Sequence, residues 1–183
     1  MRVIAGVAKG KRLLAPAAST TRPTLDRVKE AVFGCLQFEL SNSSFLDLFG
    51  GSGGNGIEAA SRGAYPVYIN DVNRQCADII RQNVRNTNLV DSITVLNKDY
   101  KVVLDEFIKE DMSFDFVYLD PPFNSEYYAD AFDRLTKSAL ISTHGCIILE
   151  YEWGKNNVIC PDNYFLRKQK KLGSCGYSIF ERL

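Results

Sequence analysis

The chain alternates between short apolar runs and longer segments in which apolar residues recur every three or four positions. Short runs rich in β-branched and aromatic side chains are typical of buried strands, and the longer spacing is typical of amphipathic helices. We expect strands near residues 44–49, 66–70, 92–97, 114–119 and 145–151. The intervening helices are expected near residues 55–62, 73–87, 100–110 and 127–139. This alternation predicts an α/β fold with a mostly parallel sheet covered by helices on both faces.

Further elements are expected at the two ends of the chain. Apolar side chains recur along one face of residues 24–40, which predicts a helix before the first strand. Residues 2–5 and 11–14 predict a short N-terminal β-hairpin. Residues 164–170 and 176–182 predict an antiparallel hairpin that closes the sheet and brings it to seven strands.

Length and composition are those of one folded domain. The 183 residues are 45% apolar and 24% charged, and no stretch approaches the roughly 18 apolar residues of a membrane span. The five cysteines are scattered without a C-x-x-C pair, which predicts reduced thiols in a cytoplasmic protein. Because His144 is the only histidine, we exclude a histidine-based triad and expect no metal site. We expect residues 1–183 to form a single domain and a monomer.

The most informative motif is Asp120-Pro121-Pro122-Phe123, which follows the apolar run 114–119. In an open α/β sheet, ligands bind at the carboxyl ends of the strands, where this motif should lie. The carboxylate accepts hydrogen bonds, the prolines hold backbone carbonyls as further acceptors in a stiff loop, and the aromatic ring offers a stacking surface. These groups suit a flat base with an exocyclic amine. A Pro-Pro pair after a strand is also typical of a simple rigid turn.

A glycine-rich loop lies upstream, between a predicted strand and a predicted helix. It begins at Asp47, and this context is typical of loops that hold nucleotide-like ligands. The positions that fit the dinucleotide-binding pattern are Gly51, Gly53 and Gly56. The next strand delivers Asp71, 20 positions after Gly51, the interval at which an acid holds ribose hydroxyls. Asp71 could instead cap the helix that begins near Asn73.

The net charge is zero, but basic residues gather at both ends of the chain. Residues 1–30 hold seven basic and two acidic side chains, and residues 164–183 hold five and one. Two basic ends on a neutral domain predict a local footprint for a polyanion, although a solvated surface is the commoner explanation of any one cluster. Because the two clusters flank a base-binding motif, we expect residues 1–23 to contact nucleic acid as a basic extension. The expected phosphate contacts are Lys9, Lys11, Arg12 and Arg22.

The order of these motifs resembles that of class I S-adenosylmethionine-dependent methyltransferases. A closer resemblance, which covers essentially the whole chain, rests on several sequence blocks. These blocks are Arg2-Val3-Ile4-Ala5-Gly6, Thr21-Arg22-Pro23-Thr24, Asp26-Arg27-Val28-Lys29-Glu30-Ala31, Gly56-Ile57-Glu58-Ala59 and Ser61-Arg62-Gly63-Ala64. They resemble the bacterial 16S rRNA (guanine-N2)-methyltransferases of the RsmD type. Asn55 and Asn73 depart from that pattern, since relatives usually carry an apolar and an acidic residue there.

The resemblance implies a Rossmann-like methyltransferase fold, S-adenosylmethionine as cofactor and methyl transfer to N2 of a guanine in 16S rRNA. The partner is expected to be 16S rRNA or an assembling small ribosomal subunit, with no membrane involved. Asp120 and the Pro121 carbonyl would bind the target amine, and Phe123 would clamp the base. The residues expected to bind the cofactor are Asp47, Gly51, Gly53, Gly56, Asp71 and Asp99. Asp99 would contact the adenine amine, or it could equally cap a helix.

Other functions remain open at this point. A DNA adenine-N6 or a protein glutamine methyltransferase also uses a Pro-Pro-aromatic loop. A nicotinamide-dependent oxidoreductase would explain the glycines and Asp71 but would leave Asp120 without a role. An RNA-binding domain that has lost its cofactor would keep only the basic residues.

Overall fold

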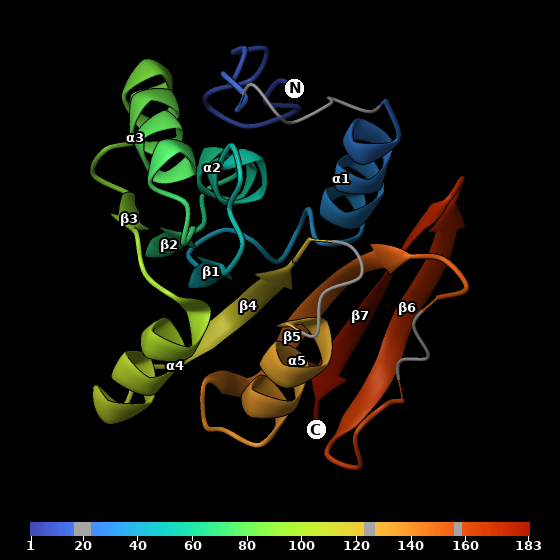
Figure 1. Cartoon of the computed structure of the whole chain (residues 1–183). Coiled ribbons are helices and arrows are strands. Elements are labelled where there is room, and N and C mark those ends of the chain that lie inside the picture. Colours follow the sequence, from blue (N-terminus) through green and yellow to red (C-terminus); the bar gives the residue numbers. More distant parts are fainter. Residues whose placement is uncertain (17–22, 123–126, 156–158) are drawn as a thin grey trace.

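A seven-stranded sheet organises the protein, in the order β3-β2-β1-β4-β5-β7-β6 (Figure 1). The structure is a computed structural model that describes residues 1–16, 23–122, 127–155 and 159–183, without the side chains of 23–26. The five parallel strands are β1 (Phe45–Asp47), β2 (Val67–Asn70), β3 (Ile93–Leu96), β4 (Phe114–Leu119) and β5 (Ile141–Glu152). The closing strands are β6 (Tyr164–Leu172) and β7 (Cys175–Arg182), and β7 runs antiparallel to both β5 and β6.

Helices cover both faces of this sheet. They are α1 (Pro23–Cys35), α2 (Gly54–Ser61), α3 (Arg74–Thr87), α4 (Tyr100–Lys109) and α5 (Tyr127–Thr136). One face packs against α1, α2 and α3, and the other packs against α4 and α5 (Figure 1). Side chains alternate between the faces, so Tyr118 and Ile148 belong to the first core and Val117 and Ile147 to the second. The predicted α/β class and the mostly parallel sheet are confirmed.

The observed elements differ from the predicted ones mainly at their ends. The first helix ends at Cys35 rather than near residue 40. The chain turns directly after it, and in this turn the Glu39 N–H donates to the Leu36 carbonyl at 2.9 Å. β5 begins at Ile141, four residues earlier than predicted. The pairing of β5 with β4 shifts register near this start, where His144 has a φ of 64°. Among the described residues, no helix is long and apolar enough to cross a membrane.

The N-terminal segment does not form the two regular strands that its sequence predicts. It is a compact loop in which Arg2 and Arg12 make a single antiparallel bridge. The Val3 N–H donates to the Lys11 carbonyl at 3.0 Å, and the Gly10 N–H donates to the Val3 carbonyl at 2.9 Å. The segment cannot pair as two extended strands, because its middle packs against α2. The Cβ of any other residue at Gly6, whose φ is 82°, would collide with the Ser61 carbonyl.

Glu58 on α2 holds this segment in place. Its side chain is fully buried, and its carboxylate accepts the N–H groups of Ile4 at 2.8 Å and Ala5 at 3.0 Å. It also pairs with Lys29 at 3.6 Å and Arg62 at 2.8 Å. One carboxylate therefore joins the N-terminal segment, α1 and α2.

We expect Glu58→Ala to lower the free energy of unfolding by about 3–5 kcal/mol, because it leaves buried cations without their carboxylate partner. Urea unfolding measures this loss. The control is Glu106→Ala, whose ion pair with Lys98 is 42% exposed on both sides and should cost less than about 1 kcal/mol. Equal losses for the two variants would contradict the anchoring role of Glu58.

Candidate functional site

The carboxyl ends of four parallel strands meet around one cavity of about 390 Å³. That volume lies within the ~300–1,000 Å³ typical of small-molecule sites. The lining residues are Phe49, Gly51, Asn70, Asp71, Val72, Asp99, Tyr100, Asp120, Pro121, Pro122 and Tyr127. The glycine loop, two of the predicted cofactor acids and the Asp-Pro-Pro motif thus line a single pocket, as their positions at strand ends predict.

The glycine loop is shaped by backbone contacts on both of its sides. The Gly50 N–H donates to the Asn70 carbonyl at 2.7 Å, and Gly53, with a φ of 81°, begins α2. Any Cβ at Gly56 would collide with the side chain of Ile69, so only glycine lets α2 approach β2 this closely. Of the three glycines expected at the cofactor, Gly51 lines the cavity, whereas Gly53 and Gly56 shape the loop behind it.

Asp71 braces the loop from the end of β2. Its Oδ2 accepts the Gly51 N–H at 2.8 Å, and its Oδ1 accepts the Asn73 N–H at 2.8 Å. The cap of α3 is Asn73 itself, which accepts the Gln75 N–H at 2.8 Å. The capping alternative for Asp71 is therefore wrong. The Cys76 thiol also forms a hydrogen bond with this carboxylate. A carboxylate offers about four acceptor positions, so at least one remains for a hydroxyl donor in the cavity.

Asp99 caps a helix and also lines the cavity. It is the N-cap of α4, where its Oδ1 accepts the Lys101 N–H at 2.8 Å, and it also lines the cavity. Its second oxygen is available to an amine donor in the cavity.

Asp47 lies behind the loop and does not line the cavity. It is fully buried at the end of β1, and its Oδ2 accepts the Gly56 N–H at 3.0 Å. Its Oδ1 has no hydrogen-bond partner among the described residues. Burial raises the pKa of Asp47 to about 7, and the bond from Gly56 opposes that rise.

Asp120 follows β4 directly and faces the cavity together with Pro121. Burial raises the pKa of Asp120 to about 7, so its carboxyl group changes charge near neutral pH. A carboxyl group with such a pKa accepts hydrogen bonds when it is ionised, and it can also take up a proton near neutral pH. Phe123, the fourth residue of the motif, lies outside the described residues, as does Arg22.

Three aromatic walls of the cavity were not among the predicted site residues. The ring of Tyr100 lies 5.4 Å from that of Phe49 and 5.7 Å from that of Tyr127. Tyr100 is held by its hydroxyl, which donates to Asp130 at 2.7 Å. Phe49 comes two residues after Asp47, and Tyr100 comes directly after Asp99. Their places beside predicted site acids are a signal that could have identified them.

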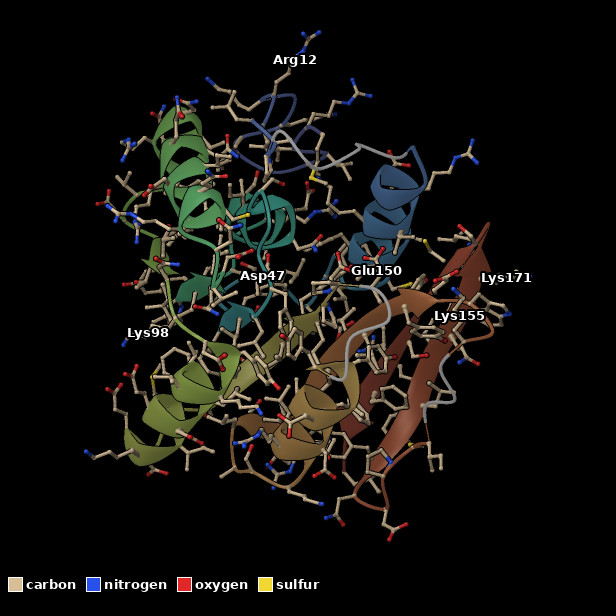
Figure 2. All side chains as sticks on the ribbon, viewed as in Figure 1. Arg12, Asp47, Lys98, Glu150, Lys155 and Lys171 are labelled. Carbon is tan, nitrogen blue, oxygen red and sulfur yellow. The ribbon has the colours of Figure 1, made fainter. Side chains whose placement is uncertain are left out.

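The predicted RNA-binding side chains Lys9, Lys11 and Arg12 are exposed and do not line the cavity. Figure 2 shows the side chain of Arg12 at the outer edge of the molecule, pointing away from the ribbon of the N-terminal segment. Asn83 on α3 connects this segment to the glycine loop. Its Nδ2 donates to the Leu14 carbonyl at 2.9 Å and to the Ser52 carbonyl at 2.8 Å. Among the described residues, no group of three or more metal-binding side chains is found.

Comparisons with known proteins agree with this geometry. A family model described as "Conserved hypothetical protein 95" matches residues 1–181. The ribosomal RNA small subunit methyltransferase D of Haemophilus influenzae is 31% identical over 99% of this chain and 93% of its own length. The protein of the same name from Escherichia coli K12 is 27% identical over 100% of this chain and 90% of its own length.

Solved structures share the whole fold. A methyltransferase candidate from Escherichia coli superposes with a TM-score of 0.88, at 27% identity over 100% of this chain and 97% of that one. An O-methyltransferase from Bacillus cereus, in complex with S-adenosylhomocysteine, has a TM-score of 0.71 at 17% identity, over 92% of this chain and 84% of that one. The second likeness supports the fold alone. The match over residues 1–181 and the full-length similarity to the Haemophilus protein show that the chain belongs to the conserved hypothetical protein 95 family, which includes the ribosomal RNA small subunit methyltransferase D proteins.

Proposed function

We propose that the protein transfers a methyl group from S-adenosylmethionine to N2 of a guanine in 16S rRNA. The observation that carries this proposal is the position of Asp120 and Pro121 in the same cavity as Gly51 and Asp71. A methyl group passes directly between cofactor and acceptor, so both must reach one cavity. The relatives named ribosomal RNA small subunit methyltransferase D support the RNA substrate.

The cofactor is S-adenosylmethionine, and the residues of the cavity fit it. The carboxylate of Asp71 is positioned for ribose hydroxyls, and Asp99 is positioned for the adenine amine. Phe49, Val72 and Tyr100 give the cavity apolar walls for the flat adenine. When bound, the cofactor supplies an electrophilic methyl group on a sulfonium centre.

Asp120 and Pro121 would act on the acceptor amine. The lone pair of guanine N2 is delocalised into the ring, which makes the amine a poor nucleophile. Hydrogen bonds from the amine to the Asp120 carboxylate and the Pro121 carbonyl favour the pyramidal nitrogen of the transition state and stabilise its developing positive charge. Asp120, with its raised pKa, can then accept the proton that N2 loses. Phe123 is proposed to stack on the base and align it.

We infer that the exposed N-terminal basic residues bind RNA phosphates, and that Arg22 joins them. A base inside a duplex cannot enter such a cavity, so the target guanine must be single-stranded or flipped out. The link through Asn83 ties the position of these residues to the glycine loop. We propose a cytoplasmic monomer that acts on 16S rRNA or an assembling small subunit.

The function is tested by mass spectrometry of 16S rRNA nucleosides from a strain that lacks the gene. We expect 2-methylguanosine to fall by one residue per 16S rRNA and to return when the gene is restored. An unchanged 2-methylguanosine content together with a loss of methylated adenine in DNA would favour the adenine-N6 alternative. Stabilisation against heat by NAD but not by S-adenosylhomocysteine would favour an oxidoreductase.

We expect Asp71→Ala to weaken S-adenosylmethionine binding by about 10–100-fold, since hydrogen bonds to a charged group contribute about 1.5–3 kcal/mol. Isothermal titration calorimetry measures this change. Asp78→Ala serves as the control, because Asp78 is 61% exposed and pairs with Arg81 on the surface of α3. An unchanged affinity for Asp71→Ala would remove that residue from the cofactor site.

A further inference from the structure

Three carboxyl groups gather at the cavity, one lining it and two buried behind it. They belong to Asp47, Asp120 and Glu150, which come from the adjacent strands β1, β4 and β5. Asp47 is fully buried, and Glu150 is 3% exposed. Figure 2 shows Asp47 and Glu150 in the interior, whereas Arg12 and Lys171 lie at the outer edge. Of the three, only Asp120 lines the cavity.

Strand register explains why these groups are neighbours. Asp47 pairs with Tyr118, and Leu119 pairs with Leu149, so Asp120 and Glu150 are the next residues on neighbouring strands. Neighbouring strands lie about 4.7–4.9 Å apart. Tyr118 and Ile148 point into the core beneath α1 and α2, and alternation along each strand directs Asp120 and Glu150 to the same face.

Glu150 has little to stabilise a negative charge. Its Oε2 accepts the Tyr118 hydroxyl at 3.0 Å, while its Oε1 has no hydrogen-bond partner among the described residues. Tyr177 faces it in the β5–β7 register, and the Tyr177 hydroxyl lies 3.6 Å from the Cys35 sulfur of α1. The negative charges that act on Glu150 are those of Asp120 and Asp47, and both disfavour its ionised form. Burial acts in the same direction, so Glu150 is favoured in its protonated form.

Burial keeps protons on this cluster near neutral pH. Burial, and then repulsion from Asp120 and Asp47, raise the pKa of Glu150 well above its usual range, against the lowering effect of the Tyr118 bond. Burial also raises the pKa of Asp120 and that of Asp47 to about 7. Because the groups interact, the cluster titrates as a unit and its protons belong to no single carboxyl group.

We propose that Glu150 is a positioning residue of the methyl transfer, and that the buried carboxyl cluster gives up a proton to solvent when the cationic cofactor enters the cavity. The inference rests on the proposed function, in which Asp120 must be ionised to bind the target amine. A positive charge near the cluster favours its ionised forms, so arrival of the methyl donor would itself charge Asp120. Loss of that charge after transfer, when the cofactor becomes a neutral thioether, would favour return of a proton.

Calorimetry of cofactor binding tests this proposal without RNA. Titrations in buffers of different ionisation enthalpy count the protons released on binding. At pH 7 we expect S-adenosylmethionine to release protons from the cluster and neutral S-adenosylhomocysteine to release far fewer. Equal release by the two ligands would overturn the proposal.

The Glu150→Gln variant isolates the role of Glu150, because Gln keeps an acceptor for Tyr118 but cannot ionise. At pH 8, proton release on S-adenosylmethionine binding should fall about threefold or more in the variant, because Gln cannot take part in the titration of the cluster. The control is Glu152→Gln, two residues along β5, whose carboxylate pairs with Lys155 at 3.0 Å and should leave the proton count unchanged. A merely structural role for Glu150 would alter stability or affinity but not this count.

If Glu150→Gln does not fold, Tyr118→Phe provides a second route. Removing the hydroxyl that favours ionised Glu150 should also reduce proton release at pH 8. Unchanged release in whichever variant folds would overturn the proposal. Failure of the proposed function itself would be seen separately, as RNA methylation that survives Asp120→Ala.

Discussion

Asp120→Ala is expected to lower the rate of RNA methylation by about 10²–10³-fold or more, while the affinity for S-adenosylmethionine falls far less, by no more than about tenfold. The reason is that the Asp120 carboxylate acts on the acceptor amine at the end of β4, whereas the loop at Gly51 and Asp71 holds the cofactor. Single-turnover transfer of a labelled methyl group to 16S rRNA measures the rate, and calorimetry measures the affinity.

The matched control is Asp120→Asn, which keeps the shape and one oxygen acceptor but loses the charge. It should retain more activity than the alanine variant and bind the cofactor about as tightly as that variant does. Near-normal turnover by Asp120→Ala would show that another group binds the amine. Loss of cofactor binding in both variants would place Asp120 in the cofactor site instead.

The second large effect is expected from reversing the charge of Lys9, Lys11 and Arg12 to glutamate. Each cation that leaves an RNA phosphate lowers the slope of log affinity against log salt by about 0.7–0.9, so the slope should fall by about 2–3. Affinity for 16S rRNA at low salt should fall by several orders of magnitude. Filter binding at a series of salt concentrations measures both quantities, and cofactor affinity should not change.

The control is a triple variant with the same change of charge, made at lysines at the end of α4, just after α5 and after β5. Lys109, Lys137 and Lys155 are exposed, and their reversal to glutamate should leave the salt slope near the wild-type value. If the two triple variants behave alike, general electrostatic attraction rather than an N-terminal footprint would account for RNA binding.

The strands and most of the pocket could be predicted because each depends on local sequence. Apolar runs fix the strands, and residues just after parallel strands must reach one edge, which is why Gly51, Asp71 and Asp120 meet. The role of Asp71 in bracing Gly51 could not be distinguished from helix capping, because the two differ only in which N–H groups lie nearby. That information exists only in three dimensions.

Other features depend on long-range contacts that no local pattern reports. Glu150 lies in an apolar run and looks like an ordinary strand residue, and only the register of β4 and β5 places it beside Asp120. The N-terminal hairpin was predicted from strand-like residues, but Glu58, more than fifty residues away, draws that segment onto α2. Tertiary contacts override local propensity at both places.

The proposed methyl transfer requires the methyl donor and Asp120 to meet in one cavity, and a crystal structure with S-adenosylhomocysteine tests this most directly. We predict that the ribose lies at Asp71 and that the sulfur faces Asp120, leaving room for an acceptor nitrogen about 3–3.5 Å from the transferred methyl carbon. A ligand bound elsewhere, or a sulfur turned away from Asp120 and Pro121, would contradict the proposed reaction.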